Sequence, residues 1–354
     1  MNLNKNKINY LFLLLVMLLA TSNLMAQRQE ADIDWGLHPI DYSREGRSGF
    51  QFLKLPVNAR FAGMAGITTA LGQGDASYSL ANPASITDVK GLDLSFSSMN
   101  WIADIGYISG SIVKNFGRFG TLGLNYISVD YGDMERTEYT LLVDEAGESL
   151  GKTQPSYNLE TVTGGDLSVG LSYARNVTDR LKFGVVLKYV QETLDDATTG
   201  NWALDVGTLY YTGVKTLRIA MLGQHFGPDA EFLGYDEQIQ IPAQRIRLPQ
   251  QLRFGAAIDL LEGKDGNPHL LTVATEFVHP NDGEGKVHVG LEYSFMNFMM
   301  FRSGYRFNYD EEGLTLGGGL RLYTGGYSVL FNYAYLDFGR LEQVHLFSIG
   351  LGRD

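Results

Sequence analysis

The chain of 354 residues contains no cysteine, which excludes disulfide bonds, thiolate metal sites and cysteine nucleophiles. Charged residues make up only 19% of the sequence, and acidic residues outnumber basic ones by 40 to 28. This balance argues against a nucleic-acid partner, because such a partner needs a basic surface. After residue 26 no apolar run approaches the roughly 18 residues of a transmembrane helix, so we expect no such helix.

Motifs of common enzymes are also lacking. There is no P-loop and no H-E-x-x-H motif, and the pair Gly72-x-Gly74 is followed by Ser77 where a dinucleotide site needs a third glycine. The six histidines show no metal-ligand spacing. We therefore expect no enzyme and no cofactor. Two acidic clusters in expected loops, Asp195-Asp196 and Asp282 with Glu284, have the chemistry of calcium ligands, although solvated loop charge explains them more simply.

The first 26 residues carry the pattern of a secretory signal peptide. Lys5 and Lys7 precede an unbroken apolar stretch, 11–20, and a small residue, Ala26, ends the region. The stretch is too short to span a bilayer, although an N-terminal anchor helix is the alternative. We predict export with cleavage after Ala26, which leaves the periplasm, secretion or the outer membrane as destinations.

Glycine (42 residues), tyrosine (20) and phenylalanine (19) are abundant. From Gly91 onward the side chains alternate with a period of two; for example, Phe301 and Tyr305 share one face and Arg302 and Arg306 the other. Alternation over about 10 residues is typical of strands that cross a membrane. Fourteen segments show it: 91–99, 104–113, 119–130, 165–175, 180–192, 201–211, 215–226, 250–261, 268–278, 286–296, 298–309, 313–323, 326–337 and 342–351.

The connections between these segments alternate in length. Counted from the first strand, the even-to-odd links are short, whereas the two longest links, 131–164 and 227–249, are odd-to-even. Short periplasmic turns opposite long external loops are the pattern of an outer-membrane barrel. A soluble β-sandwich or periplasmic barrel is the alternative, but its strands are usually shorter. We predict an all-β chain whose residues 91–354 form a transmembrane antiparallel β-barrel of about 14 strands, surrounded by outer-membrane lipid.

A barrel of this size needs a filler or becomes a conduit. Residues 27–90 lack alternation and are rich in small residues, so we expect them to fold back as an N-terminal plug (hatch); a periplasmic tail is the alternative. The charges expected to face the lumen either form a path or binding surface, or pair with one another and brace the wall. They are Asp205, Arg253, Asp259, Glu276, Glu292, Arg302, Arg306 and Arg321.

Several motifs carry a resemblance to a known family. They are Phe52-Leu-Lys-Leu-Pro56, Ala59-Arg60, Gly63-Met-Ala-Gly66, Asn82-Pro83-Ala84, Val278-His-Pro-Asn-Asp282, Val289-Gly-Leu-Glu-Tyr293, and Gly304-Tyr305 with Asn308-Tyr-Asp-Glu-Glu-Gly-Leu-Thr315. With them the chain resembles the PorV/PorQ family, which belongs to the wider FadL-like group of outer-membrane barrels. The resemblance implies a fourteen-stranded barrel with a hatch, in which Arg60, Gly63, Gly66, Asn82 and Pro83 lie. One departure is the end of the chain, Arg353-Asp354, which lacks the terminal aromatic residue common in outer-membrane barrels.

The resemblance leaves two functions open. PorV-type members look like components of the type IX secretion system, which engage a Sov/SprA-like translocon and receive cargo with a C-terminal sorting domain. In that case the external loop 227–249, with Phe232, Tyr235 and Ile239, is the expected partner-contact surface. FadL-like relatives instead admit long-chain fatty acids or other hydrophobic small molecules past a displaced hatch. A third hypothesis is a barrel that has this fold but performs neither function.

Overall fold

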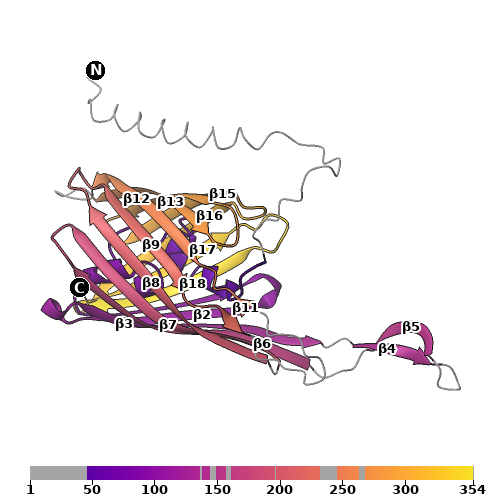
Figure 1. The fold of residues 1–354 in the computed structure, drawn as a ribbon. Helices are drawn as coiled ribbons and strands as arrows, with labels where there is room; N and C mark the ends of the chain where they lie inside the picture. Colours follow the sequence, from indigo (N-terminus) through magenta and orange to yellow (C-terminus); the bar gives the residue numbers. More distant parts are fainter. Residues whose placement is uncertain are drawn as a thin grey trace, which may run out of the picture. The chain divides into compact units, whose positions relative to one another are not determined.

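The computed structural model describes residues 46–135, 138–143, 149–156, 161–195, 197–231, 245–262 and 268–353. They belong to one compact unit, Arg44–Asp354. The predicted signal peptide, 1–26, lies outside the described residues. Fourteen antiparallel strands form a closed barrel, as the alternation predicts (Figure 1). No helix among the described residues is long and apolar enough to cross a membrane.

Every predicted strand is present, with bounds that differ from the prediction by a few residues. The barrel strands are β1 (Leu92–Asn100), β2 (Gly106–Asn115), β3 (Thr121–Glu135), β6 (Thr161–Asn176), β7 (Leu181–Leu194), β8 (Ala197–Tyr211), β9 (Arg218–Phe226), β12 (Gln251–Glu262), β13 (His269–Pro280), β14 (Lys286–Phe295), β15 (Met299–Phe307), β16 (Leu314–Thr324), β17 (Tyr327–Leu336) and β18 (Val344–Arg353). Neighbours in the chain pair with each other, and β1 pairs with β18 to close the ring.

The two ends of the barrel differ in their connections. At one, which we call the short-turn end, β16 and β17 are joined by two glycines with positive φ, Gly325 and Gly326, as a tight hairpin requires. The other, the loop end, carries the longer connections. These include the paired strands β4 (Glu138–Val143) and β5 (Ser149–Ser156), and β10 (Ala230–Glu231) with β11 (Arg245–Ile246). Short 3₁₀ turns, η4 (Ile102–Asp104) and η5 (Gly117–Phe119), follow β1 and β2.

The outer face of the wall is apolar, since alternate side chains along each strand point outward and most are hydrophobic. Aromatic side chains gather at both ends. Trp202, 57% exposed, lies near the loop end, and Phe119, 67% exposed, lies at the short-turn end. Such exposure would be unfavourable in water but suits lipid, and aromatic girdles at both rims are typical of barrels that span a membrane.

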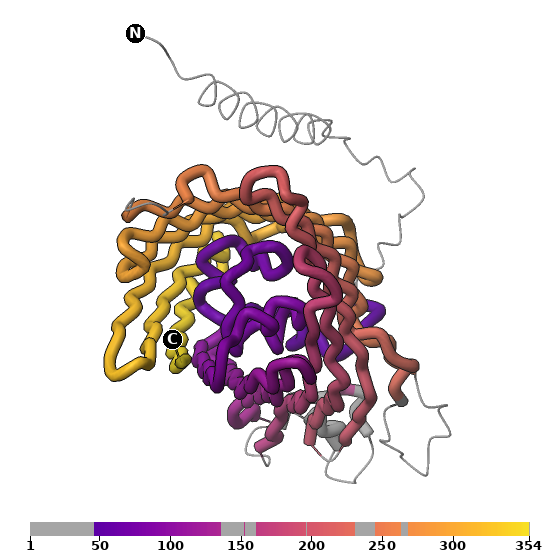
Figure 2. The backbone as a smooth tube through the Cα atoms, turned by 90° about the vertical axis from the view of Figure 1, so that its left-hand side faces the viewer, coloured from indigo at the N-terminus to yellow at the C-terminus, as the bar shows by residue number. Residues whose placement is uncertain are grey.

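Residues 46–90, here called the lumenal segment, lie inside the ring of strands (Figure 2). They contain four short helical turns: η1 (Gln51–Lys54), α2 (Ala59–Ala62), η2 (Ala76–Leu80) and η3 (Pro83–Asp88). The segment meets the wall at the loop end, where Gly49 N–H donates to Arg247 C=O at 3.0 Å. It leaves at the short-turn end, where Asn115 at the end of β2 donates to Val89 C=O at 2.7 Å. It therefore runs the length of the barrel, whereas residues 27–45 of the predicted plug lie outside the described residues.

The sequence of the lumenal segment explains its turns. Asn58 accepts a hydrogen bond from Arg60 N–H and so begins α2, and Asn82 caps η3, whose first residue is Pro83; both are preferred helix-start arrangements. Between the turns, apolar side chains pack against one another, and the rings of Phe61 and Tyr78 meet edge to face with centroids 4.9 Å apart. The lumen is thus filled by a small hydrophobic core of its own.

Candidate functional site: the seam between the lumenal segment and the wall

Inward-facing glycines make room for the lumenal segment. A Cβ on Gly207 would lie 2.1 Å from Asn82 Oδ1, and one on Gly255 would lie 1.8 Å from Thr69 Oγ1. No side chain fits at such distances, so these positions must be glycine while the segment is in place. Four strands supply such a glycine, which together we call the glycine ring: Gly184, Gly207, Gly255 and Gly304. Gly290 and Gly317 also face the segment, where a Cβ would lie 3.0 and 3.1 Å from the nearest atom.

The predicted hatch residues all lie at this seam. Gly63 packs against β16, where its Cβ would be 3.0 Å from Gly317 Cα, so Gly317 allows close packing of the segment against this strand. Gly66 has φ +79° and lies beside the guanidinium of Arg306. The Asn82 side-chain amide donates to Thr208 C=O of β8 at 3.1 Å, and Pro83 lies against Gly184.

The deepest charged contact joins the lumenal segment to β14 and β15. Arg60 Nη2 lies 2.9 Å from Glu292 Oε1, and Arg302 Nε lies 2.6 Å from Glu292 Oε2. All three side chains are buried. Burial opposes protonation of Arg60, but the neighbouring Glu292 carboxylate more than offsets it and holds the pKa of Arg60 above its usual value. For the neighbouring phenol of Tyr78, burial has the opposite effect and raises the pKa.

Two wall arginines clasp the strip of the segment that follows Gly63. Arg306 Nε donates to Ala65 C=O at 3.2 Å and pairs with Glu312. Arg218 donates to Leu71 C=O at 2.8 Å and pairs with Asp259 at 2.7 Å. In each case the guanidinium binds a barrel carboxylate and a backbone carbonyl of the segment at once.

Arg253 and Glu276 complete this clasp. Arg253 Nη1 lies 2.9 Å from Glu276 Oε1 and donates to Gly66 C=O at 3.3 Å. Glu276 Oε2 accepts hydrogen bonds from the backbone N–H groups of Thr68 and Thr69, both at 2.9 Å, and from the Thr69 hydroxyl at 2.7 Å. Strip 65–71 is therefore held by charge-assisted hydrogen bonds along its length.

The remaining predicted lumen charges lie elsewhere. Asp205 pairs with Lys188 at 2.6 Å. Arg321 faces inward at the short-turn end, where it donates to Asn297 at 3.1 Å. It lines a polar cavity of about 770 Å³ together with Asp75, Asp93 and Arg353, so it does not join the clasp.

At the loop end the structure corrects the interpretation of Asp282 as solvated loop charge. Its side chain is buried and accepts hydrogen bonds from Lys54 Nζ at 2.6 Å, from Gln51 at 3.0 Å and from Ser48. Burial raises the pKa of Asp282, but these hydrogen bonds outweigh burial and hold that pKa below its usual value. Asp282 thus anchors the start of the lumenal segment.

Several residues singled out from the sequence do not form a site in the part of the chain that the structure describes. The partner-contact residues Phe232, Tyr235 and Ile239 lie outside the described residues. A Gly-x-Ser-x-Gly pattern surrounds Ser149, but this residue begins the hairpin strand β5 rather than the strand-to-helix turn of a hydrolase nucleophile. Among the described residues, no group of three or more acidic, histidine or cysteine side chains is placed to hold a metal ion.

The apolar outer face, the polar inner face and the enclosed segment define a membrane-spanning β-barrel with a filled lumen. Solved structures with this fold include the CymD monoaromatic hydrocarbon channel, with 14% identity, a TM-score of 0.54, and coverage of 85% of this chain and 98% of that one. The Ralstonia pickettii toluene transporter TbuX matches with 14% identity, a TM-score of 0.53, and coverage of 86% and 100%. A Pseudomonas aeruginosa FadL homologue matches with 10% identity, a TM-score of 0.51, and coverage of 84% and 98%.

No protein-family model and no curated protein sequence matches the chain. The shared architecture with these channels and transporters establishes a FadL-like barrel fold. These matches do not test the resemblance to the PorV/PorQ family in particular, so that resemblance stays a prediction.

Proposed function

We propose that this protein is an outer-membrane transporter of hydrophobic small molecules, gated by the lumenal segment. The observation that carries the proposal is the way in which strip 65–71 is held. Each clasping arginine has its carboxylate partner on the barrel: Asp259 for Arg218, Glu276 for Arg253 and Glu312 for Arg306.

This arrangement lets the strip leave without stranding a charge. If strip 65–71 moves away from the wall, the three barrel ion pairs stay intact, and the arginines and Glu276 lose only uncharged partners on the strip. Water entering the lumen replaces those bonds, and as hydrogen bonds to charged groups each has a net value of about 1.5–3 kcal/mol. Stranding a buried charge by removing its ion-pair partner would cost about 3–5 kcal/mol.

The strip is flanked by contacts that hold more firmly. On one side the segment's own Arg60 is paired with the buried Glu292, and its loss would strand a charge. On the other side Asn82 and Pro83 are fitted against Gly207 and Gly184. The gating motion is therefore a local displacement of strip 65–71 rather than expulsion of the whole segment.

The substrate class follows from the barrels of like fold, which are described as carrying monoaromatic hydrocarbons and toluene. Long-chain fatty acids share with these hydrocarbons a large apolar part and low solubility in water, although they also carry a carboxyl group.

Because the chain has no cysteine, the gate can be tested with an engineered disulfide. A Cβ on Gly290 would lie 3.2 Å from Met64 Cβ, near the separation of about 3.5–4.5 Å across a disulfide. The variant Met64→Cys/Gly290→Cys is reconstituted in vesicles, and entry of toluene or palmitate is measured before and after reduction. We expect oxidation to stop entry and reduction to restore it.

The matched control is Thr275→Cys/Val289→Cys, which joins facing residues of β13 and β14 and leaves the segment free. Its entry rate should not depend on the redox state. Equal entry through the oxidised and reduced Met64–Gly290 variant would refute gating by the strip. Entry no faster than in protein-free vesicles would refute transport itself.

A second candidate function is a docking component of a type IX secretion system. It is supported by the motif resemblance and by the unequal height of the wall. The adjacent strands β3, β6, β7 and β8 have 14 to 16 residues, whereas β1, β9, β14, β15 and β17 have 9 or 10. One side of the loop end is therefore raised, as a surface for a partner barrel or cargo would be.

This candidate predicts that the tagged protein, purified in mild detergent, brings down a large translocon barrel or sorting-domain cargo. Recovery of the barrel with bound fatty acid and no protein partner would favour transport.

A further inference from the structure

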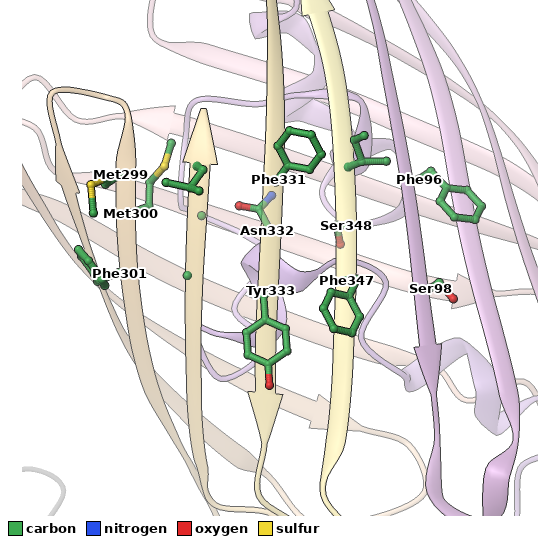
Figure 3. A pocket seen from close by; sticks show the side chains of 14 residues that line it. Phe96, Ser98, Met299, Met300, Phe301, Phe331, Asn332, Tyr333, Phe347 and Ser348 are labelled. Atoms are coloured by element: carbon green, nitrogen blue, oxygen red, sulfur yellow. The ribbon is translucent and has the colours of Figure 1, made fainter. Parts of the chain in front are cut away.

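The outer wall contains a groove that none of the functions above uses. It is a hollow of about 580 Å³ over strands β15 to β18 and β1. Its floor is the glycine pair Gly318-Gly319 of β16, and Phe331, Tyr333 and Phe347 stand beside it on β17 and β18 (Figure 3). We call this hollow the outer groove.

The groove exists because one outward position carries no side chain. Along β16, Leu316 and Leu320 point outward and are 44% and 45% exposed, and Gly318 lies between them. A Cβ on Gly318 would have Met300 C=O at 3.9 Å as its nearest neighbour. Unlike the glycine ring, this glycine is not required by any close contact, so its effect is to leave space between aromatic walls.

The surroundings of the groove indicate its occupant. It lies in the apolar outer face that the bilayer covers, and its outward lining includes no charged side chain. An acyl chain is the neighbour that a membrane supplies, and a narrow apolar slot between aromatic rings fits it.

One end of the groove is polar. The Tyr333 hydroxyl lies 2.7 Å from His345 Nδ1, and the two rings stack with centroids 6.0 Å apart. His345 is the second residue of β18, next to the loop end. A headgroup lying there would have a hydroxyl and an imidazole as hydrogen-bond partners, while its chain would run over Gly318 toward the middle of the wall.

We propose that the outer groove is a binding site for one acyl chain of a membrane lipid from the leaflet at the loop end, with its headgroup beside Tyr333 and His345. The proposal concerns the outer face and does not rest on transport. The site would keep a specific lipid beside the wall that backs onto Gly63 of the lumenal segment.

The test is photolabelling of the full chain in phospholipid vesicles. The probe is a phosphatidylglycerol whose palmitoyl chain bears a mid-chain diazirine, and labelled residues are identified by mass spectrometry. We expect Phe331 and Phe347 to be labelled about fivefold more than Leu171, which is 52% exposed on β6; fivefold corresponds to ~1 kcal/mol of preferential binding.

Two variants test whether the preferential labelling depends on the outer groove. Gly318→Leu fills the groove and should reduce labelling of Phe331 and Phe347 to the level of Leu171. Val169→Phe adds similar bulk on the lipid-facing side of β6 and should leave the pattern unchanged. If Gly318→Leu fails to give a folded barrel on gels, Phe331→Ala serves instead, because it removes one wall of the groove and should lower labelling at Phe347.

The headgroup contact is tested separately. A headgroup-free alkane diazirine should label the groove about fivefold less than the lipid probe, and Tyr333→Phe should remove that difference. Labelling that merely follows exposure around the whole barrel would overturn the site. Equal labelling by the alkane and the lipid in the wild-type chain would overturn the anchored lipid as occupant.

Discussion

Strand β16 shows how differently the two faces of one wall use the same residue type. Gly317 points inward and packs against Gly63 of the lumenal segment, where a Cβ would lie only 3.1 Å from Gly63 Cα. Its neighbour Gly318 points outward into open space. The inner face is a fitted surface of glycines and paired charges, whereas the outer face is an exposed apolar surface whose neighbour is lipid. Changes on the inner face should therefore cost much more than matched changes on the outer face.

The largest effect is expected for Glu292→Gln. The substitution leaves the buried guanidiniums of Arg60 and Arg302 without their carboxylate, which should destabilise the folded protein by about 3–5 kcal/mol. Urea unfolding of the protein in vesicles measures this loss. The double variant Arg60→Gln/Glu292→Gln leaves one unpaired guanidinium instead of two and should regain part of the stability. A single variant as stable as the wild type would contradict the fitted-surface interpretation.

The next effect is expected for Gly207→Leu in the glycine ring. Its Cβ would lie 2.1 Å from Asn82 Oδ1, so η3 must move away from β8, at a cost of about 1–3 kcal/mol. We expect the segment to be displaced in a measurable fraction of molecules, seen as higher conductance in planar bilayers and faster cleavage of the segment by protease. The same substitution on the outer face, Gly318→Leu, is the control and should leave both readouts at the wild-type level.

The strands and their lipid-facing side could be predicted from the sequence, because contact with lipid on one face imposes a strict period of two. Alternation alone located all fourteen strands and placed Arg302 and Arg306 on the inner face. The lengths of the connections between strands distinguished the short-turn end from the loop end. These features depend on local pattern and on the thickness of a bilayer, and both can be read along the chain.

The contacts between the inner face of the wall and the lumenal segment were harder to predict, because they join residues far apart in the chain. Gly207 and Asn82 meet across more than a hundred positions, and a glycine at an inward position looks like a gap in the alternation rather than a fitted contact. Arg218 was missed as a lumen charge, although it begins an inward series with Ala220 and Leu222. Asp282 looked like solvated loop charge because its partner Lys54 lies 228 residues away.

A smaller effect is expected at the rim, where the inner face meets solvent. The hydrogen bonds from Lys54, Gln51 and Ser48 depress the pKa of Asp282. A carboxyl whose folded pKa lies below its unfolded value, about 3.9, contributes stability that is fully present above that pH and is lost as pH falls through the folded pKa. Asp282→Asn should therefore weaken the anchor by about 1 kcal/mol at neutral pH, and the difference from wild type should shrink below about pH 4.

Hydrogen exchange at residues 50–53 reports this anchor directly, because Phe50 and Leu53 follow Ser48 into the lumen. Exchange should be faster in Asp282→Asn than in wild type at pH 7 and should converge at low pH. A difference that persists unchanged at pH 3 would show that the Asp282 charge is not what holds the start of the segment.

The smallest effect is expected for Gly318→Leu itself. A Cβ added at Gly318 meets only an ordinary van der Waals distance, with Met300 C=O at 3.9 Å as the nearest atom, and substitutions at open surface positions usually change stability by less than about 0.5 kcal/mol. Its unfolding midpoint in vesicles should match wild type, whereas the inward neighbour variant Gly317→Leu should unfold at clearly lower urea because Gly63 stands in its way. If both variants lost stability equally, the two faces of β16 would not differ as the contacts indicate, and the outer groove would be a packed surface rather than a space that lipid fills.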